Sequence, residues 1–351
     1  MTNPGTVLEN MLIESGMSRK ELAQRTAVSE KHICTVVNGE KGISAAFARK
    51  LGYVFKNTAY WLNLQAEYDE EQLLIKEENS ISVEEIAILK PLHDITTFFI
   101  QKGYMHNDCG NASKVMQLRE LLNVSDLTLI PNITYNAAYR AQLSSNVKID
   151  PYVLFAWQRL CEKETENIYV KNSLNLDLLR NKLQEIKAMM FNEINQVVQN
   201  LQMIFSECGI AFKVVKNFRG APVQGFIKAS SSNRLILCLT IRRQRADTFW
   251  FTLFHEIAHI LNRDFSTRFV DFDSIQSEQE GKADTFASNY LIDPDVYRGF
   301  LRSITAITWH DIQDLAEKEQ VMPFIVVGRL QNDGYLDWSD YSDKIPRYSW
   351  A

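Results

Sequence analysis

The sequence predicts a multidomain protein in which all-α regions precede a C-terminal α+β domain with a small sheet. Three observations support this class. The chain has 351 residues, more than a single hydrophobic core usually serves. Apolar residues recur at helical spacing through most of 82–205, and strand-like runs begin only near residue 210. We therefore expect domains at 1–70, 71–205 and 206–351, the middle one a helical linker or dimerisation region.

Composition places the chain among ordinary globular proteins. Hydrophobic residues make up 46% and charged residues 23% of it. No apolar run reaches the roughly 18–20 residues of a membrane span, and the N-terminus lacks the basic segment of a secretory signal. The five cysteines are scattered without a CxxC pair, so we expect free thiols and a cytoplasmic location. Residues 1–68 hold eight lysines or arginines against six acidic residues, so within a chain of net charge −5 only this end favours nucleic acid.

Residues 18–39 predict two short helices joined by a tight turn. Ser18 caps the first helix, and Glu21 three residues later completes a capping box. The turn is Thr26-Ala27-Val28, Ser29 caps the second helix, and Asn38-Gly39 ends it. This pattern is typical of a helix-turn-helix, whose second helix enters the major groove of DNA.

The outward positions of this motif supply candidate DNA contacts. Those on the second helix face base edges, and those at the two helix starts hold the backbone. The second-helix set is Glu30, Lys31, His32 and Thr35, and the helix-start set is Arg19, Lys20 and Ser29. The alternative is a helical bundle used for protein contact or dimerisation.

Residues 4–68 resemble the HigA-type antitoxin branch of the Cro/CI (XRE) helix-turn-helix family. The pattern ELAQR…VS…I…NG and the tail WLNLQ carry the resemblance. It implies a homodimer that binds operator DNA and represses its own operon. The family usually has glycine in the turn where this chain has Ala27. If that position needs a positive φ, alanine costs about 1 kcal/mol there.

The C-terminal part predicts a small sheet followed by two helices. Residues 210–215, 223–228 and 235–241 are typical of strands, and the last two flank a turn-forming run that predicts a hairpin. We expect helices around 249–261 and 279–291, the first braced by core residues Trp250, Phe251 and Phe254. Strand 235–241 directly precedes that helix, and we expect it to pair with an extended substrate.

The first of these helices carries the motif HExxH. His255 and His259 are four residues apart, so on a helix both point from one face and can hold one metal ion. Glu256 lies beside them, where it can accept a proton from metal-bound water. The motif predicts a zinc site with a general base.

A catalytic zinc site needs a third protein ligand, which must come from elsewhere in the chain. Glu280 on the next helix is the favoured candidate, and Glu278 is its rival. Asp284 follows Glu280 by four residues and shares its face. Asp284 can therefore accept the other ring NH of a ligand histidine and fix its tautomer.

Residues 212–294 resemble the ImmA/IrrE metallopeptidase family, which has a zincin-like fold. The matching segments are GFIK, LILCLTIRRQR, FWFTLFHEIAH and E-x-x-A-D-x-F-A-x-x-x-L-I-x-P. The resemblance implies that His255, His259 and Glu280 bind Zn²⁺ and that Glu256 is the general base of peptide hydrolysis. Ala258 and Asp293 replace the family's usual glycine and methionine. Three residues are oxyanion-stabilising candidates by type alone: His310, Tyr290 and Tyr297.

Together these features predict a DNA-binding transcriptional regulator that carries a zinc endopeptidase. Its expected partners are operator DNA, a second copy of the chain, and a repressor or toxin encoded nearby, with no membrane. Two alternatives remain: an antitoxin-type autorepressor whose metal domain only binds or senses, and a self-cleaving regulator. Self-cleavage would suit an exposed, extended bond near 69–82. A zinc held by the same ligands in a purely structural site is a further reading.

Overall fold

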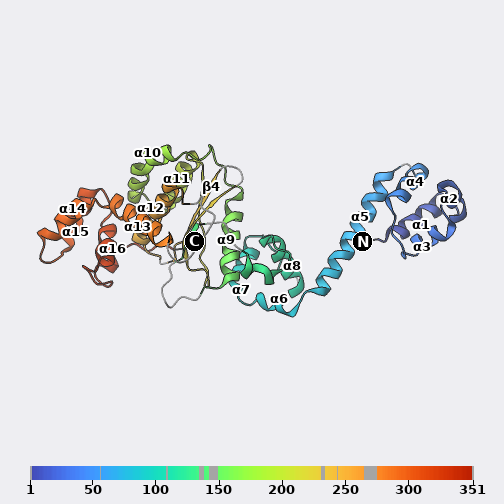
Figure 1. The fold of residues 1–351 in the computed structure, drawn as a ribbon, viewed down its shortest axis with the longest axis horizontal. Helices are drawn as coiled ribbons and strands as arrows, with labels where there is room; N and C mark the ends of the chain where they lie inside the picture. Colours follow the sequence, from blue (N-terminus) through green and yellow to red (C-terminus); the bar gives the residue numbers. More distant parts are fainter. Residues whose placement is uncertain are drawn as a thin grey trace. The chain divides into compact units, whose positions relative to one another are not determined.

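The computed structural model describes residues 2–55, 57–107, 110–133, 138–141, 149–230, 234–242, 244–264 and 275–349. The chain forms two compact units, which Figure 1 colours along the sequence. The first unit comprises residues 1–86 with 109–116, and the second comprises 87–108 with 117–351. No helix in the described part combines the length and apolarity that crossing a bilayer requires.

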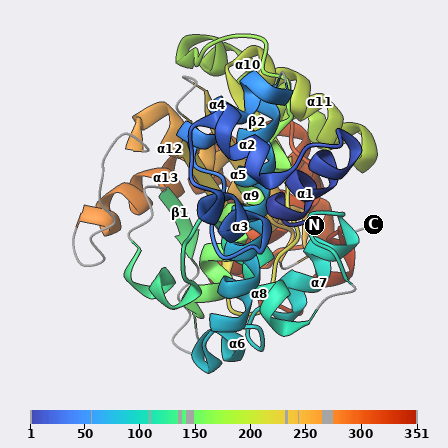
Figure 2. The ribbon, with the colours of Figure 1, turned by 90° about the vertical axis from the view of Figure 1, so that its right-hand side faces the viewer.

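The first unit is all α. Its helices, shown in Figures 1 and 2, are α1 (Pro4–Glu14), α2 (Arg19–Thr26), α3 (Glu30–Val37), α4 (Ala45–Phe55), α5 (Thr58–Ser80) and the start of α6 (Val83–Ile88). Leu8, Leu22, Ile33, Phe47 and Trp61 are buried in one core that joins α1 to α5. The expected boundary at residue 70 falls inside α5, because this helix continues to Ser80.

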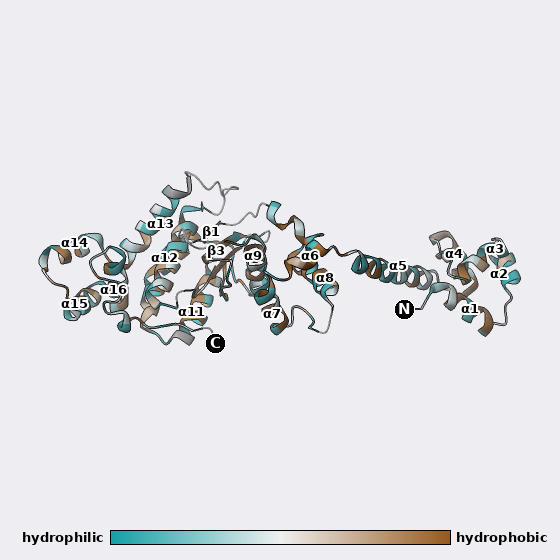
Figure 3. Cartoon of the chain, turned by 90° about the horizontal axis from the view of Figure 1, so that it is seen from below, coloured by the Kyte–Doolittle hydropathy of each residue, from teal (hydrophilic) through white to brown (hydrophobic). Residues whose placement is uncertain are grey.

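The second half of α5 differs from the first. The first half contains the buried residue Trp61. Beyond Trp61 the helix is largely hydrophilic in Figure 3. The region considered for self-cleavage, 69–82, is helical to Ser80 and therefore not extended. A peptidase acts on extended chain, so cutting here would first require α5 to unwind.

The helix-turn-helix forms as the sequence predicts, with one exception. The side-chain oxygen of Ser18 accepts from the backbone N–H of Glu21 at 3.1 Å, and that of Ser29 accepts from the N–H of His32 at 3.2 Å. The carboxylate of Glu21 accepts from Arg25 at 2.6 Å, so Ser18 caps α2 by its side chain alone. Ala27 ends α2 with φ 49° and ψ 49°, the left-handed conformation that favours glycine.

The second unit surrounds a small sheet with helices. Before the last three strands of the sheet come α7 (His93–Gln101), α8 (Asn111–Leu122, which begins in the first unit), η1 (Leu127–Asn132), α9 (Pro151–Glu166), α10 (Leu176–Ala188), η2 (Met189–Phe191) and α11 (Ile194–Glu207), with the first strand between η1 and α9. The strands are β1 (Ala138–Ala141), β2 (Ile210–Val214), β3 (Val223–Ala229) and β4 (Leu235–Leu239). After it come α12 (Ala246–Asn262), α13 (Ile275–Leu291), α14 (Pro294–Ser303), α15 (Trp309–Glu319), α16 (Pro323–Asn332) and η4 (Ser342–Lys344).

The strand order is β1-β3-β4-β2. β3 and β4 form the predicted antiparallel hairpin, β2 lies parallel to β4, and β1 pairs antiparallel with β3. The expectation that 235–241 would pair with substrate is wrong, because β4 has β3 on one side and β2 on the other. Both of its hydrogen-bonding edges are already used.

Helices cover both faces of the sheet, with α9 and α12 on opposite sides in Figure 1. Phe226 packs against Trp157 of α9, whereas the neighbouring Ile227 belongs to the core that includes Phe254 of α12. Successive strand residues point to opposite faces, which explains this division. Leu183 of α10 and Leu201 of α11 join the α12 core. The expected linker 71–205 is therefore divided, and its last part shares its core with α12.

Candidate metal centre and nucleic-acid interface

Helix α12 positions the three HExxH side chains in its middle. His255, Glu256 and His259 are 0%, 1% and 7% exposed, because neighbouring helices and the sheet enclose the helix on nearly all sides. The spacing of four brings the two imidazoles together, with their Nε2 atoms 2.9 Å apart. Two buried histidines whose Nε2 atoms converge could hold one metal ion.

Helix α13 supplies the third donor. The carboxylate oxygens of Glu280 lie 3.1 Å from Nε2 of His255 and 3.4 Å from Nε2 of His259. Glu278 instead has an exposed side chain that pairs with Lys282 at 2.7 Å, and this pairing lowers its pKa. The geometry therefore favours Glu280 over Glu278.

The other ring nitrogen of each histidine is held by a carboxylate. Asp284, which the sequence singles out, lies 2.8 Å from Nδ1 of His255. Asp264 lies 2.8 Å from Nδ1 of His259, a contact that no pattern in the sequence indicates. It follows Arg263, which ends α12 in the left-handed conformation at φ 62°. With each Nδ1 bonded to a carboxylate, each Nε2 is the nitrogen available to a metal.

The electrostatics of the cluster suit a cation. Burial lowers the pKa of His259, but hydrogen bonds to Glu280 and Asp264 and the nearby charge of Glu256 outweigh it and raise the pKa to about 9. Burial raises the pKa of Glu280, yet its hydrogen bonds to the two histidines bring that pKa well below its usual range. A metal ion would replace the proton that these acceptors attract.

The donor set fits zinc. Two histidines with one glutamate are the protein ligands of one known class of catalytic zinc site, which leaves a fourth position open. Ligands about 2.05 Å from a tetrahedral ion lie about 3.3 Å from one another. The separations of 2.9, 3.1 and 3.4 Å among these donors are close to that value.

Glu256 has its own place against the sheet. A Cβ on Gly225 of β3 would lie 2.0 Å from Oε1 of Glu256, so only glycine at residue 225 leaves room for this carboxylate. Gly225 thereby fixes how far the carboxylate can approach β3. Glycine in a strand interior often marks such a close approach.

The three oxyanion candidates are engaged in different ways. His310 is on α15, where its exposed side chain lies 3.4 Å from Asp314. Tyr290 stacks on Phe254 with ring centroids 5.2 Å apart. The hydroxyl of buried Tyr297 donates to Asp333 at 3.0 Å. Each of the three side chains therefore has a contact within the protein that does not involve the proposed metal site.

The candidate DNA contacts divide by exposure. Lys20, Ser29, Glu30 and Lys31 are exposed, as the sequence predicts. His32 and Thr35 are only half-exposed: the His32 ring meets Phe47 edge-on at 5.1 Å, and the Thr35 hydroxyl donates to the His32 carbonyl at 2.8 Å. The ring contact joins α3 to α4, whereas the hydroxyl bond lies within α3.

Arg19 has a partner within the protein. Its guanidinium donates to the carboxylate of Glu9 at 2.6 and 3.0 Å, and this pairing raises its pKa. The pair joins the start of α2 to α1. Lys20 is thus the helix-start cation with its charge directed outward.

No family model matches the chain. Virulence-associated protein A' of Dichelobacter nodosus is 36% identical to it over 73 residues, which are 20% of this chain and 64% of that protein's length. Two solved structures each cover 23% of the chain: the Pseudomonas aeruginosa antitoxin HigA with higBA promoter, and an addiction module antidote protein of the HigA family from Coxiella burnetii. They are 31% and 30% identical, are covered over 96% and 95% of their own length, and have TM-scores of 0.22 and 0.21. The chain is thus similar to these proteins over about a fifth to a quarter of its length.

Proposed function

We propose that this protein is a DNA-binding regulator whose second unit is a zinc endopeptidase acting on a protein partner, a repressor or a toxin. One observation carries the peptidase part. Three ligand atoms from His255, His259 and Glu280 lie within 4.8 Å of one another, and buried Glu256 is beside them on the same helix. This combination provides both a metal site and a general base.

The chain's own residues divide the work of hydrolysis. Bound zinc would supply a Lewis acid that polarises the peptide carbonyl and lowers the pKa of water. Asp264 and Asp284 hold the ligand imidazoles in one tautomer and one orientation. Glu256 accepts the proton of the attacking water and returns it to the amine that leaves when the C–N bond breaks.

The test combines metal content with cleavage. We expect one zinc per chain by native mass spectrometry, lost in His255→Ala and retained in Glu256→Gln. Incubation with the proteins encoded beside this chain should give fragments with the wild type and none with Glu256→Gln. Wild-type protein that takes up no zinc would overturn the proposal. Equal cleavage by Glu256→Gln would remove this residue as the base.

The regulator part rests on the helix-turn-helix. Lys20, Glu30 and Lys31 are exposed at the start of α2 and of α3, where such motifs contact backbone and bases. A homodimer would place two such helices on the two half-sites of an operator. In this proposal the first unit binds the operator, and the second unit hydrolyses the protein partner.

The second candidate is an antitoxin-type autorepressor whose metal domain only binds. The same three ligands would serve it, so metal content cannot separate the two functions. Glu256 can, because a binding domain does not need a buried carboxylate beside its ligands. If Glu256→Gln represses its operon and binds its protein partner as the wild type does, the result favours the binding role.

A further inference from the structure

Strand β1 brings an extended segment of the chain to the edge of the sheet beside the metal centre. It pairs antiparallel with β3, and Arg140 is the residue opposite Gly225. Gly225 in turn lies against the carboxylate of Glu256. Opposite residues of an antiparallel pair have Cα atoms about 5 Å apart, so the backbone at residue 140 lies within about 9 Å of that carboxylate. An added strand at a sheet edge is also how many proteins hold an extended peptide.

The pairing of β1 with β3 changes register at one peptide bond. Arg140 is opposite Gly225, but Ala141 is opposite Val223, so the register passes over Gln224. This irregularity has the form of a β-bulge, in which two residues of one strand oppose one residue of the other. Bulges interrupt the ladder of hydrogen bonds and are common next to active sites. The bond between Arg140 and Ala141 is therefore where the regular ladder is interrupted.

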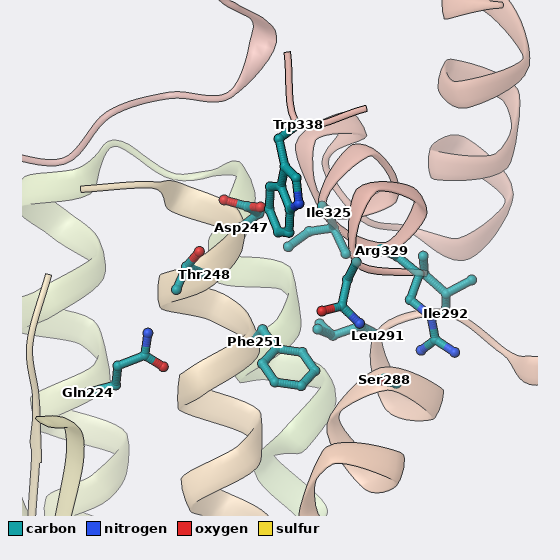
Figure 4. A pocket seen from close by; sticks show the side chains of 12 residues that line it. Gln224, Asp247, Thr248, Phe251, Ser288, Leu291, Ile292, Ile325, Arg329 and Trp338 are labelled. Carbon is teal, nitrogen blue, oxygen red and sulfur yellow. The ribbon is translucent and has the colours of Figure 1, made fainter. Parts of the chain in front are cut away.

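Contacts between β3 and α12 support this break in register. Successive residues of a regular strand point to opposite faces of the sheet. Gln224 and Gly225 nevertheless both meet α12, since Oε1 of Gln224 accepts from Thr252 at 3.3 Å and Gly225 lies against Glu256. Figure 4 shows Gln224 beside the helix that carries Phe251, a predicted core residue that is half-buried and lines the pocket drawn there. The interruption of the ladder therefore lies over the HExxH helix.

The place of β1 in the chain gives a cut there a consequence. In sequence the helix-turn-helix precedes β1, and the HExxH helix follows it. Because β1 belongs to the same chain as the metal centre, its effective concentration at this edge is on the order of millimolar or higher. Its extended backbone also meets the requirement that 69–82 does not, because that region is helical to Ser80.

We propose that this protein is its own substrate and that its metal centre hydrolyses the bond between Arg140 and Ala141. The inference rests on the proposed peptidase function and names a substrate for it. The oxygen of water adds to the carbonyl carbon of Arg140, and Glu256 passes the proton of that water to the nitrogen of Ala141 as the C–N bond breaks. The products are a carboxyl group on Arg140 and an amino group on Ala141. The cut detaches the operator-binding unit from the metal centre, so repression ends without a second protein.

The test starts from full-length protein that is purified with a chelator and then loaded with zinc. We expect denaturing mass spectrometry to show the fragments 1–140 and 141–351, formed about 100-fold more slowly or not at all in Glu256→Gln. Denaturing conditions are needed because α7 and η1 contact α9 and can hold the fragments together. The rate constant should not change when the protein is diluted, because enzyme and substrate are one chain.

Two variants of one residue test the bond itself. Ala141→Pro removes the N–H of the amide that is cut and should stop the reaction, whereas Ala141→Ser keeps this N–H and should react as the wild type does. Both variants should take up zinc like the wild type. Hydrogen exchange of zinc-loaded Glu256→Gln gives a measurement that does not depend on cleavage. The amides of β1 and β3 should exchange slowly there, because the two strands are paired.

The failure of this inference can be told apart from the failure of the proposed function. Protein that takes up no zinc overturns both. Zinc-loaded wild-type protein that stays intact overturns self-cleavage alone, because cleavage of a partner has its own test. Self-cleavage is also overturned by equal cutting of Glu256→Gln, by a rate constant that falls on dilution, by fragments that end at another bond, or by rapid exchange of the β1 amides.

Discussion

Gly225 of β3 leaves the space that the Glu256 side chain of α12 occupies. The strand residue lacks a side chain where the helix residue needs the space, since a Cβ there would meet Oε1 at 2.0 Å. Because β3 backbone is rigidly paired on both sides, the carboxylate and not the strand would have to move. The position of the proposed general base is therefore set by a residue with no functional group.

We predict that Gly225→Ala keeps zinc but loses cleavage. The added methyl group displaces the Glu256 carboxylate, and a misplacement of about 1 Å costs on the order of 10²-fold in rate. The measurement is the cleavage rate per bound zinc. Gly299→Ala on α14 is the matched control, because a Cβ there meets nothing within 4 Å. Full activity in Gly225→Ala would show that Glu256 is not the base.

We predict that Asp264→Ala lowers zinc affinity about 10–100-fold, because His259 loses the carboxylate that orients its ring. Competition with a chromophoric chelator measures the change. Asp284→Ala should behave alike through His255. Asp295→Ala removes an exposed carboxylate on α14 and should leave zinc affinity unchanged. An Asp264 variant with wild-type affinity would limit this residue to capping the chain after α12.

At this scale the sequence singles out the proposed ligands but not all of the carboxylates that contact them. Residues four apart on a helix share one face, so the sequence alone predicts that the side chains of HExxH, and those of Glu280 and Asp284, lie together. The contact of Asp264 with His259 could not be predicted in this way, because Asp264 follows the left-handed Arg263, where helical spacing no longer applies. The role of Gly225 could not be predicted either, because a close approach between strand and helix is a long-range property.

Among the elements, α3 carries the predicted contacts with DNA bases, which single substitutions can test. Lys31 and Glu30 are its exposed charged residues, whereas the His32 ring packs edge-on against Phe47. Specificity should therefore depend on Lys31 more than on His32. The start of α2 presents Lys20, since Arg19 is paired with Glu9.

We predict that Lys31→Ala costs about 1–3 kcal/mol of discrimination between the operator and unrelated DNA. Lys20→Ala should weaken binding to both alike and reduce the salt slope of log K by about 1. Fluorescence anisotropy at several salt concentrations measures both effects. Lys76→Ala on α5 is the control with the same charge change. Unaltered specificity in Lys31→Ala would exclude α3 as the recognition helix.

Element prediction succeeded where the pattern was local. The hairpin β3–β4 and helices α12 and α13 lie at the expected positions, because alternation, turn residues and helical periodicity are all short-range signals. The placement of β4 between β3 and β2 was not predictable, since β2 pairs with it across 25 residues of sequence. The same reason hid the contribution of α10 and α11 to the α12 core.

At the scale of the whole molecule, the three proposed metal ligands all belong to the second unit. We predict that removing zinc with a chelator destabilises this unit alone. At a zinc concentration 100-fold above Kd, binding stabilises the folded state by about 2.7 kcal/mol. Hydrogen exchange with mass spectrometry should show lost protection in peptides from α12 and α13, with no change in α2 and α3. Lost protection in α2 and α3 would show that the two units are energetically coupled.

Strand β1 brings the chain's own backbone to the edge of β3, with Arg140 opposite Gly225. A guest that joins the sheet at this edge has to compete with a segment that is already tethered there. Because β1 already holds this edge, an extended peptide cannot add a strand to β3 without displacing part of the chain itself.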